Sequence, residues 1–256
     1  MRGRRGLVLV ALVALLGAGC RLELDVNVEV ASDGSGAVEV VVGLDPDALD
    51  KIGGDLMAVL DVGALEDAGW VLDGPAEEGD GFTRVRIRHP FATPGEAALV
   101  FEQLAGDGGP FQDFTITRDT SFAETRVRFT GRADFAAGLE ALGDRGLAPE
   151  VDGEPLGTTV DEIEAQLGSS LSRLIQVRVR ARLPGDVTSN AATKADNGAV
   201  WQIGFGEGGV DLEATGTQRR TSALVLAGLA VLVVVAFAGM LLFRLAGRVT
   251  ATNQHQ

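Results

Sequence analysis

The chain has 256 residues, with 36 acidic and 22 basic side chains and a formal net charge of −14 at pH 7. Because binding to phosphate backbones needs concentrated positive charge, this balance excludes nucleic acid as an expected partner. There is one cysteine, Cys20, and there are two histidines, His89 and His255. An intramolecular disulfide and a cysteine-based zinc site are therefore impossible, and we expect no bound metal and no cofactor.

The N-terminal segment is typical of a secretory signal peptide. An apolar run over 7–16 follows three arginines, Arg2, Arg4 and Arg5. So short a run suits the hydrophobic region of a signal and is too short to span a bilayer comfortably. We therefore expect residues 1–19 to direct export of the chain.

The end of this segment resembles a bacterial lipobox. A leucine-rich run leads into Gly17, Ala18, Gly19 and Cys20, although Gly17 stands where the lipobox usually has leucine. The resemblance implies signal cleavage between Gly19 and Cys20 and attachment of diacylglycerol to the Cys20 thiol. The alternative is an uncleaved signal anchor with an incidental cysteine.

Alternating apolar and polar residues predict strands over 22–30 and 37–44, joined by the turn residues 32–36. Asp45 and Pro46 are typical of a helix start, so we expect helical structure to about Leu60. A second helical turn near 64–68 should precede Trp70, and further strands should follow Trp70 and cover 82–88.

The run Thr93-Pro94-Gly95-Glu96 predicts a helix to about Ala105, with Thr93 as its N-cap and Glu96 as the capping-box partner. Beyond it the pattern predicts a short helix at 134–142, a loop or linker at 145–159 and an amphipathic segment at 161–174. It predicts strands at 111–118, 122–132, 175–183, 199–205 and 210–215. Between the strands 175–183 and 199–205, the segment 186–198 is a polar excursion. We expect an α+β fold, a mostly antiparallel sheet covered by helices.

Residues 223–243 are uncharged and almost wholly apolar, with arginines on both sides. At a helical rise of about 1.5 Å per residue, this run covers roughly the 30 Å of a bilayer core. It predicts one C-terminal transmembrane helix. The expected organisation is a signal peptide (1–19), an extracytoplasmic α+β domain (20–220, with a candidate linker at 145–159), a transmembrane helix (221–243) and a cytoplasmic tail (244–256).

One segment, 183–216, has more specific features. It contains a Pro-Gly-x-Val-Thr turn, an Asn-Gly pair and a Val-x-Trp strand before a closing hairpin: Pro184, Gly185, Val187, Thr188, Asn197, Gly198, Val200 and Trp201. With the hairpin at 22–44 and the lipobox-type start, this resembles the actinobacterial LppM-type lipoproteins. Residues 51–159 carry no motif of that family. The resemblance implies an envelope-anchored α+β domain, with lipid or glycolipid binding as a suggested activity.

Arginines recur at every second position on three predicted strands, as Arg84, Arg86, Arg88, Arg126, Arg128, Arg178, Arg180 and Arg182. A period of two places each row on one face of its strand. If these strands are neighbours, the guanidinium groups form an anion patch suited to phosphate headgroups. The alternative is exposed ion pairs with acidic residues on adjacent strands, worth only tenths of a kcal/mol each.

The common catalytic motifs are absent from the sequence, so we expect no catalytic residues and no enzymatic activity. A hydrolase that uses His89 with nearby carboxylates is the least favoured hypothesis. Four phenylalanines, Phe101, Phe111, Phe114 and Phe129, either enclose an acyl-chain pocket or form plain core.

We therefore expect a bacterial lipoprotein held in the cell membrane by a lipid anchor and a single span. Its exported domain should bind a lipid, a glycolipid or a protein partner in the cell envelope. The alternative is a non-catalytic structural or assembly partner of other envelope proteins.

Overall fold

The computed structural model describes residues 20–60, 62–105, 109–135, 150–151, 154–155, 174–195, 198–204 and 209–220. Several predicted segments lie outside the described residues. They are the signal peptide, most of the short helix 134–142, most of the linker 145–159, the amphipathic segment up to residue 173, the apolar run 223–243 and the C-terminal tail.

The larger of two main sheets has seven strands in the order β11-β12-β9-β1-β2-β4-β3. Their bounds are β1 (Leu22–Val30), β2 (Gly36–Leu44), β3 (Val71–Glu77), β4 (Thr83–Phe91), β9 (Ile175–Arg182), β11 (Thr193–Ala195) and β12 (Gly198–Ile203). The central strands β1 and β9 are parallel, and the other neighbours in this sheet are antiparallel. Period-two alternation in β1 places Val26 and Val28 in the core and Glu29 on the opposite face.

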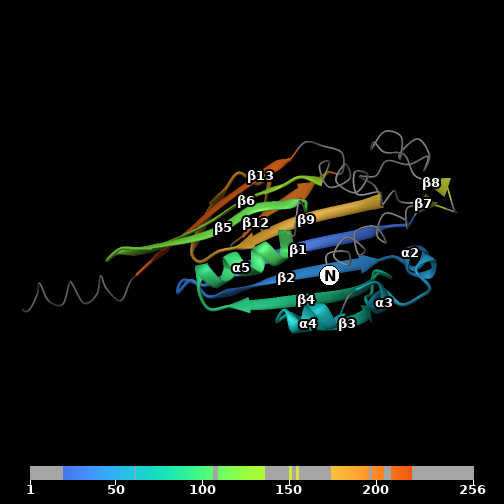
Figure 1. Cartoon of the computed structure of the whole chain (residues 1–256). Coiled ribbons are helices and arrows are strands. Elements are labelled where there is room, and N and C mark those ends of the chain that lie inside the picture. The colour runs from blue at the N-terminus through green and yellow to red at the C-terminus, as the bar shows by residue number, and fades with distance from the viewer. Residues whose placement is uncertain are drawn as a thin grey trace, which may run out of the picture.

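The smaller sheet has four strands in the order β10-β13-β6-β5, all antiparallel (Figure 1). They are β5 (Phe111–Thr120), β6 (Glu124–Ala133), β10 (Asp186–Ser189) and β13 (Val210–Arg219). A separate two-stranded pair consists of β7 (Glu150–Val151) and β8 (Glu154–Pro155). The helices are α2 (Pro46–Lys51), α3 (Leu56–Val59), α4 (Val62–Asp67) and α5 (Pro94–Ala105).

The two main sheets contribute to one hydrophobic core. Phe129 of β6 and Trp201 of β12 bring their ring centroids within 6.2 Å across the sheets. The indole N–H of Trp201 donates to the side-chain oxygen of Asn190, which follows β10, at 2.8 Å. The Asn190 amide in turn donates to the Asp211 carbonyl of β13 at 2.8 Å. Both apolar packing and hydrogen bonds therefore join the sheets.

Helix α5 packs against β5 and also contacts β4 and β2, and Figure 1 shows it between the two sheets. Its N-terminus follows the predicted capping pattern in part. The Glu96 N–H donates to the Thr93 hydroxyl at 3.2 Å, which confirms Thr93 as the cap. The Glu96 carboxylate accepts from the Ala92 N–H at 2.7 Å rather than from Thr93 itself.

The predicted α+β class is wrong. Of the described residues, 56% lie in strands and 19% in helices, so the fold is mostly β. Helices do not cover a single sheet; instead, two sheets bury each other's apolar faces, and α5 is the one described helix longer than six residues. The helical stretch expected from Asp45 to Leu60 is interrupted at Gly53 and Gly54, which both have positive φ and follow the end of α2.

The described residues also contain no transmembrane helix of the kind that the prediction placed at the C-terminus. None of the helices in the described part of the chain combines the length and apolarity needed to cross a bilayer. The run 223–243, on which the prediction rested, lies outside the described residues.

Candidate functional site

The structure separates the arginine rows that could have formed one anion patch. Arg84, Arg86 and Arg88 lie on β4, and Arg178, Arg180 and Arg182 lie on β9, with β1 and β2 between them. Arg126 and Arg128 lie on β6 in the other sheet. Each row faces away from its strand's buried apolar residues, as the alternation predicts. The β4 and β9 rows meet at one point, where Arg84 and Arg178 both contact the Glu23 carboxylate of β1.

The β9 row lies directly beside the polar side chains of β1. The parallel register places Asp25, Asn27 and Glu29 opposite the three arginines in order. Arg178 approaches Asp25 at 2.6 Å, and Arg180 donates to the Asn27 side chain at 3.0 Å. Arg182 and Glu29 are 3.6 Å apart and both are more than half exposed. These cross-strand contacts already occupy the β9 guanidinium groups.

Arg84 is the most enclosed residue of the β4 row, with a side chain 11% exposed. It extends across Gly43 of β2, where an added Cβ would lie 3.2 Å from its Cγ, and reaches Glu23 of β1 at 2.7 Å. It also pairs with Glu78 at 2.8 Å and Asp80 at 2.7 Å. The absence of a side chain at position 43 therefore permits an ion-pair network that joins three strands and the β3–β4 loop.

The remaining members of the predicted patch are more exposed than Arg84. Arg86 pairs with Glu78, Arg126 with Glu124 at 2.7 Å and Arg128 with Glu213 at 3.8 Å. Arg88 is exposed and lies opposite Glu39 in the β2–β4 register. The arrangement favours local ion pairs over a shared anion patch for Arg86, Arg126 and Arg128. Anion binding by any member of the patch stays a prediction.

The network makes a specific prediction for Asp80. Hydrogen bonds from Arg84 and from the Phe82 N–H lower the pKa of Asp80 from 3.8 to about 2. Because this pKa is lower in the folded chain, ionised Asp80 stabilises the fold above about pH 4. That contribution is lost as the pH falls through about 2. Carboxyl-carbon NMR titration should show the low pKa in the wild type and a return towards 3.8 in Arg84→Met. Equal pKa values in the two proteins would contradict the assignment.

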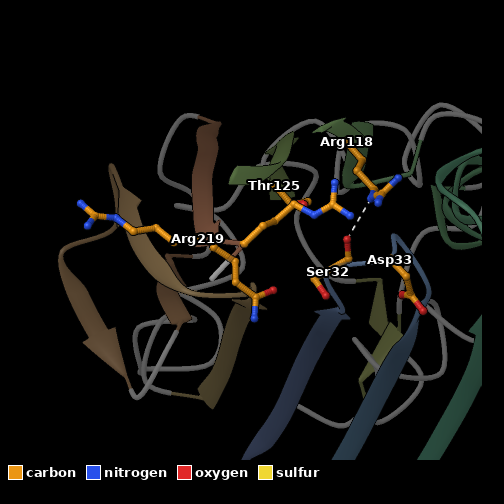
Figure 2. Close-up of a pocket in the computed structure, with 7 residues that line it drawn as sticks. Ser32, Asp33, Arg118, Thr125 and Arg219 are labelled. Atoms are coloured by element: carbon orange, nitrogen blue, oxygen red, sulfur yellow. Dashed lines mark hydrogen bonds between the residues drawn. The ribbon is translucent and has the colours of Figure 1, made fainter. Parts of the chain in front are cut away.

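A different group of arginines lines an open cleft of about 290 Å³ at one end of the two sheets (Figure 2). The large sheet contributes the turn between β1 and β2, and the small sheet contributes the adjoining ends of β5, β6 and β13. The lining residues are Ser32, Asp33, Arg118, Thr125, Gln218, Arg219 and Arg220.

Strand register explains how these side chains are placed. Arg118 lies opposite buried Val127, and Gln218 lies opposite buried Thr125, so both share the inner face of the small sheet just beyond the core. Arg219 lies opposite Glu124 on the other face, and Figure 2 shows its side chain extending away from Ser32. Arg118 Nε donates to the Ser32 carbonyl at 2.8 Å, which ties the two sheets across the cleft (Figure 2).

The electrostatics of the cleft differ from those of the arginine rows. Within the described ranges, Arg118, Arg219 and Arg220 make no ion pair with a carboxylate. The one carboxylate in the lining, Asp33, accepts from the Ser35 hydroxyl at 2.6 Å and from its N–H at 3.0 Å, which lowers the Asp33 pKa. In the described ranges the cleft therefore presents guanidinium groups that have no carboxylate within ion-pair distance, although the charge of Arg118 also helps to lower the Asp33 pKa.

Sequence reasoning missed this cleft. Its arginines do not follow a period of two, and they meet only because β13 and β5 both pair with β6. The adjacent pair Arg219-Arg220 stands out in the sequence only as the flank of the apolar run. No pattern within a single segment links it to Arg118.

Cys20, the predicted lipidation site, begins the described chain just before β1. Its side chain is 2% exposed within the hydrophobic core, and burial raises the pKa of the thiol. Lipidation of Cys20 and cleavage after Gly19 stay predictions, and an acyl chain there would require the thiol to leave the core. Cys20 and the cleft lie at opposite ends of β1, about 30 Å apart at the usual rise per residue.

The other candidates have ordinary structural environments. His89 packs edge-on against Trp70 with ring centroids 5.3 Å apart, and its Nδ1 lies 2.7 Å from the Pro90 carbonyl oxygen. The four phenylalanines considered for an acyl-chain pocket are buried and in ring contact with one another. In the described ranges no cluster of three or more metal-binding side chains occurs. The absence of metal, cofactor and catalysis stays a prediction.

Comparisons with known proteins give only a distant structural likeness. No protein-family model matches the chain, and no curated protein matches it. Among solved structures, the chain is similar to the NMR structure of the folded domain of LppM from Mycobacterium tuberculosis, with 12% identity and a TM-score of 0.39. The match covers 79% of this chain and 92% of that one. At this similarity, membership of the LppM-type family stays a prediction.

Proposed function

We propose that this chain is a non-catalytic binding protein of the bacterial cell envelope. Its β domain binds an anionic lipid, glycolipid or protein partner at the cleft between the two sheets. The observation that carries the proposal is the pair Arg118 and Arg220 in the cleft lining, neither of which makes an ion pair with a carboxylate among the described residues, in a chain whose net charge is −14. The N-terminal signal pattern supports an envelope location.

The chemistry of the cleft suits an oxyanion. Guanidinium groups bind phosphate and carboxylate oxygens through paired N–H donors, and nearby hydroxyls add further donors. Ser32, Thr125 and Gln218 supply polar groups in the same lining. The Arg118–Ser32 hydrogen bond holds the two walls in a fixed relation, so less ordering is required when a ligand binds.

The proposal includes a lipid anchor at Cys20. Because Cys20 precedes β1 without an intervening linker, an anchored chain would hold that end of the large sheet against the bilayer. The buried thiol is compatible with this only if the residue is drawn out of the core in the processed protein.

Native mass spectrometry of the full-length protein, purified from cells and incubated with an envelope lipid extract, tests both points. We expect a polypeptide that begins at acylated Cys20 and retains an anionic lipid or a copurifying partner. Arg118→Gln/Arg220→Gln should lose this ligand. Arg128→Gln/Arg182→Gln removes the same charge from two half-exposed positions outside the cleft and should retain it.

Retention of the ligand by the cleft variant would overturn the binding site. An intact N-terminus with a free thiol would overturn the anchor. The spectrum reports the retained ligand and the processed N-terminus independently, so the binding site and the anchor are judged separately.

A further inference from the structure

An exposed aromatic side chain lies beside the cleft. Phe122 is in the turn between β5 and β6 and is 64% exposed. The turn is closed by hydrogen bonds from the Ser121 N–H to the Glu124 carbonyl at 2.8 Å and from the Glu124 N–H to the Ser121 hydroxyl at 3.1 Å. A large apolar ring is therefore presented to solvent at the end of an ordered hairpin.

Basic side chains surround this turn. The Arg220 N–H donates to the Ala123 carbonyl at 2.7 Å, and its guanidinium contacts the Ser121 carbonyl at 3.5 Å. Arg219 precedes it at the end of β13, and Arg118 lies near the end of β5. Three carboxylates also lie near the turn: Glu124 pairs with Arg126, Asp119 lies opposite Arg126 in register, and Asp33 accepts from Ser35.

We propose that this tip, defined as Phe122 with Arg118, Arg219 and Arg220, docks on an anionic bilayer surface. Phe122 enters the interfacial layer, where aromatic rings are favoured, and the arginines contact lipid phosphates. The inference rests on the proposed function and deepens it by naming phospholipid headgroups within a bilayer as the partner. Charge complementarity supports it, because the tip presents guanidinium groups without a carboxylate partner in the described ranges, on a chain that is acidic overall.

The tip and the predicted anchor occupy different parts of the domain. Cys20 and the β1–β2 turn are at opposite ends of β1. Docking of the tip and insertion of an acyl chain at Cys20 into the same bilayer would therefore place β1 along the membrane plane. Tip docking itself does not require the anchor.

Quenching of a tryptophan at the tip by brominated lipids tests the contact directly. The full-length Phe122→Trp protein is reconstituted in brominated vesicles of phosphatidylcholine alone or of an equimolar mixture with phosphatidylglycerol. The native Trp70 and Trp201 are only 6% and 4% exposed, so they add a small, constant background. Leu99→Trp, on α5 and 60% exposed, is the matched control for a different surface.

We expect quenching at position 122 to be several-fold greater with phosphatidylglycerol and to exceed quenching at position 99. Arg219→Gln/Arg220→Gln in the Phe122→Trp background should weaken the phosphatidylglycerol-dependent contact by roughly tenfold or more, since each base near an anionic surface contributes to binding. Arg128→Gln/Arg182→Gln should leave it unchanged. Equal quenching in both lipid mixtures, equal quenching at positions 122 and 99, or no effect of the arginine changes would overturn the proposal.

Inorganic phosphate distinguishes a bilayer from a soluble ligand. If millimolar phosphate binds the wild-type protein in titration calorimetry while Phe122→Trp is not quenched, the cleft binds a free oxyanion and the docking proposal fails. The proposed function survives that outcome, because lipid or partner retention at the cleft is measured separately by mass spectrometry. Loss of retention with quenching intact would instead reject the proposed ligand site and keep the docking tip.

Discussion

Phe129→Ala is expected to lower the free energy of unfolding by about 3–5 kcal/mol, the usual cost of deleting a buried aromatic side chain. Phe129 is fully buried, and its ring centroid lies 6.3 Å from Phe101, 5.4 Å from Phe114 and 6.2 Å from Trp201. These neighbours belong to α5, β5 and β12. The substitution therefore opens a cavity where both sheets and the longest described helix meet.

Phe122→Ala is the matched control, since it makes the same chemical change at a side chain that is 64% exposed. We expect a change within about 0.5 kcal/mol, as for most surface substitutions. Chemical-denaturant unfolding of the two variants and the wild type, followed by tryptophan fluorescence, measures the difference. Similar losses for both variants would show that Phe129 does not join the two sheets energetically.

The period-two patterns located most of the strands because each strand's faces are distinguished locally. The alternation over 22–30 predicted β1, and the valine–arginine alternation over 175–183 predicted β9. What no local pattern specifies is that β1 and β9, far apart in the chain, pair in parallel at the centre of one sheet. The division of the strands between two sheets depends on such distant pairings, so the prediction of one helix-covered sheet was wrong.

The polar excursion over 186–198 shows the same limit on a smaller scale. Its polar composition gave no strand prediction, yet it contains β10, which pairs with β13, and β11, which pairs with β12. Both are short edge strands, where exposed polar side chains are expected and hydrophobic alternation is weak. Asn190 lies between them, and its side chain connects Trp201 to the β13 backbone.

For the candidate site, the sequence located arginines on outward faces but not their neighbours. Whether Arg178 is free or paired depends on Asp25, which is adjacent only through the β1–β9 register. The cleft was missed for a related reason. Arg118 and Arg220 meet at the cleft because β5 and β13 both pair with β6. Nothing in the β6 sequence indicates either pairing.

Arg84→Met is expected to lower the free energy of unfolding by about 1–3 kcal/mol, because it leaves partly buried carboxylates without their main partner. Glu23 is 15% exposed, and after the change Arg178, at 3.5 Å, is the one described base that remains near it. The substitution also removes the guanidinium 4.9 Å from the centre of the Phe82 ring. Methionine keeps an apolar stem over Gly43, so the loss reports the charged group rather than a new cavity.

Arg128→Met provides the comparison that separates enclosure from charge. Arg128 also extends from a strand towards a carboxylate, but it is 54% exposed and 3.8 Å from Glu213. An exposed pair of this kind contributes about 0–1 kcal/mol, so its loss should be small in the same denaturation experiment. If the two variants lose equal stability, the position of Arg84 over Gly43 has no energetic role. If Arg84→Met alone is destabilised, the network that crosses β1, β2 and β4 stabilises the outer face of the large sheet.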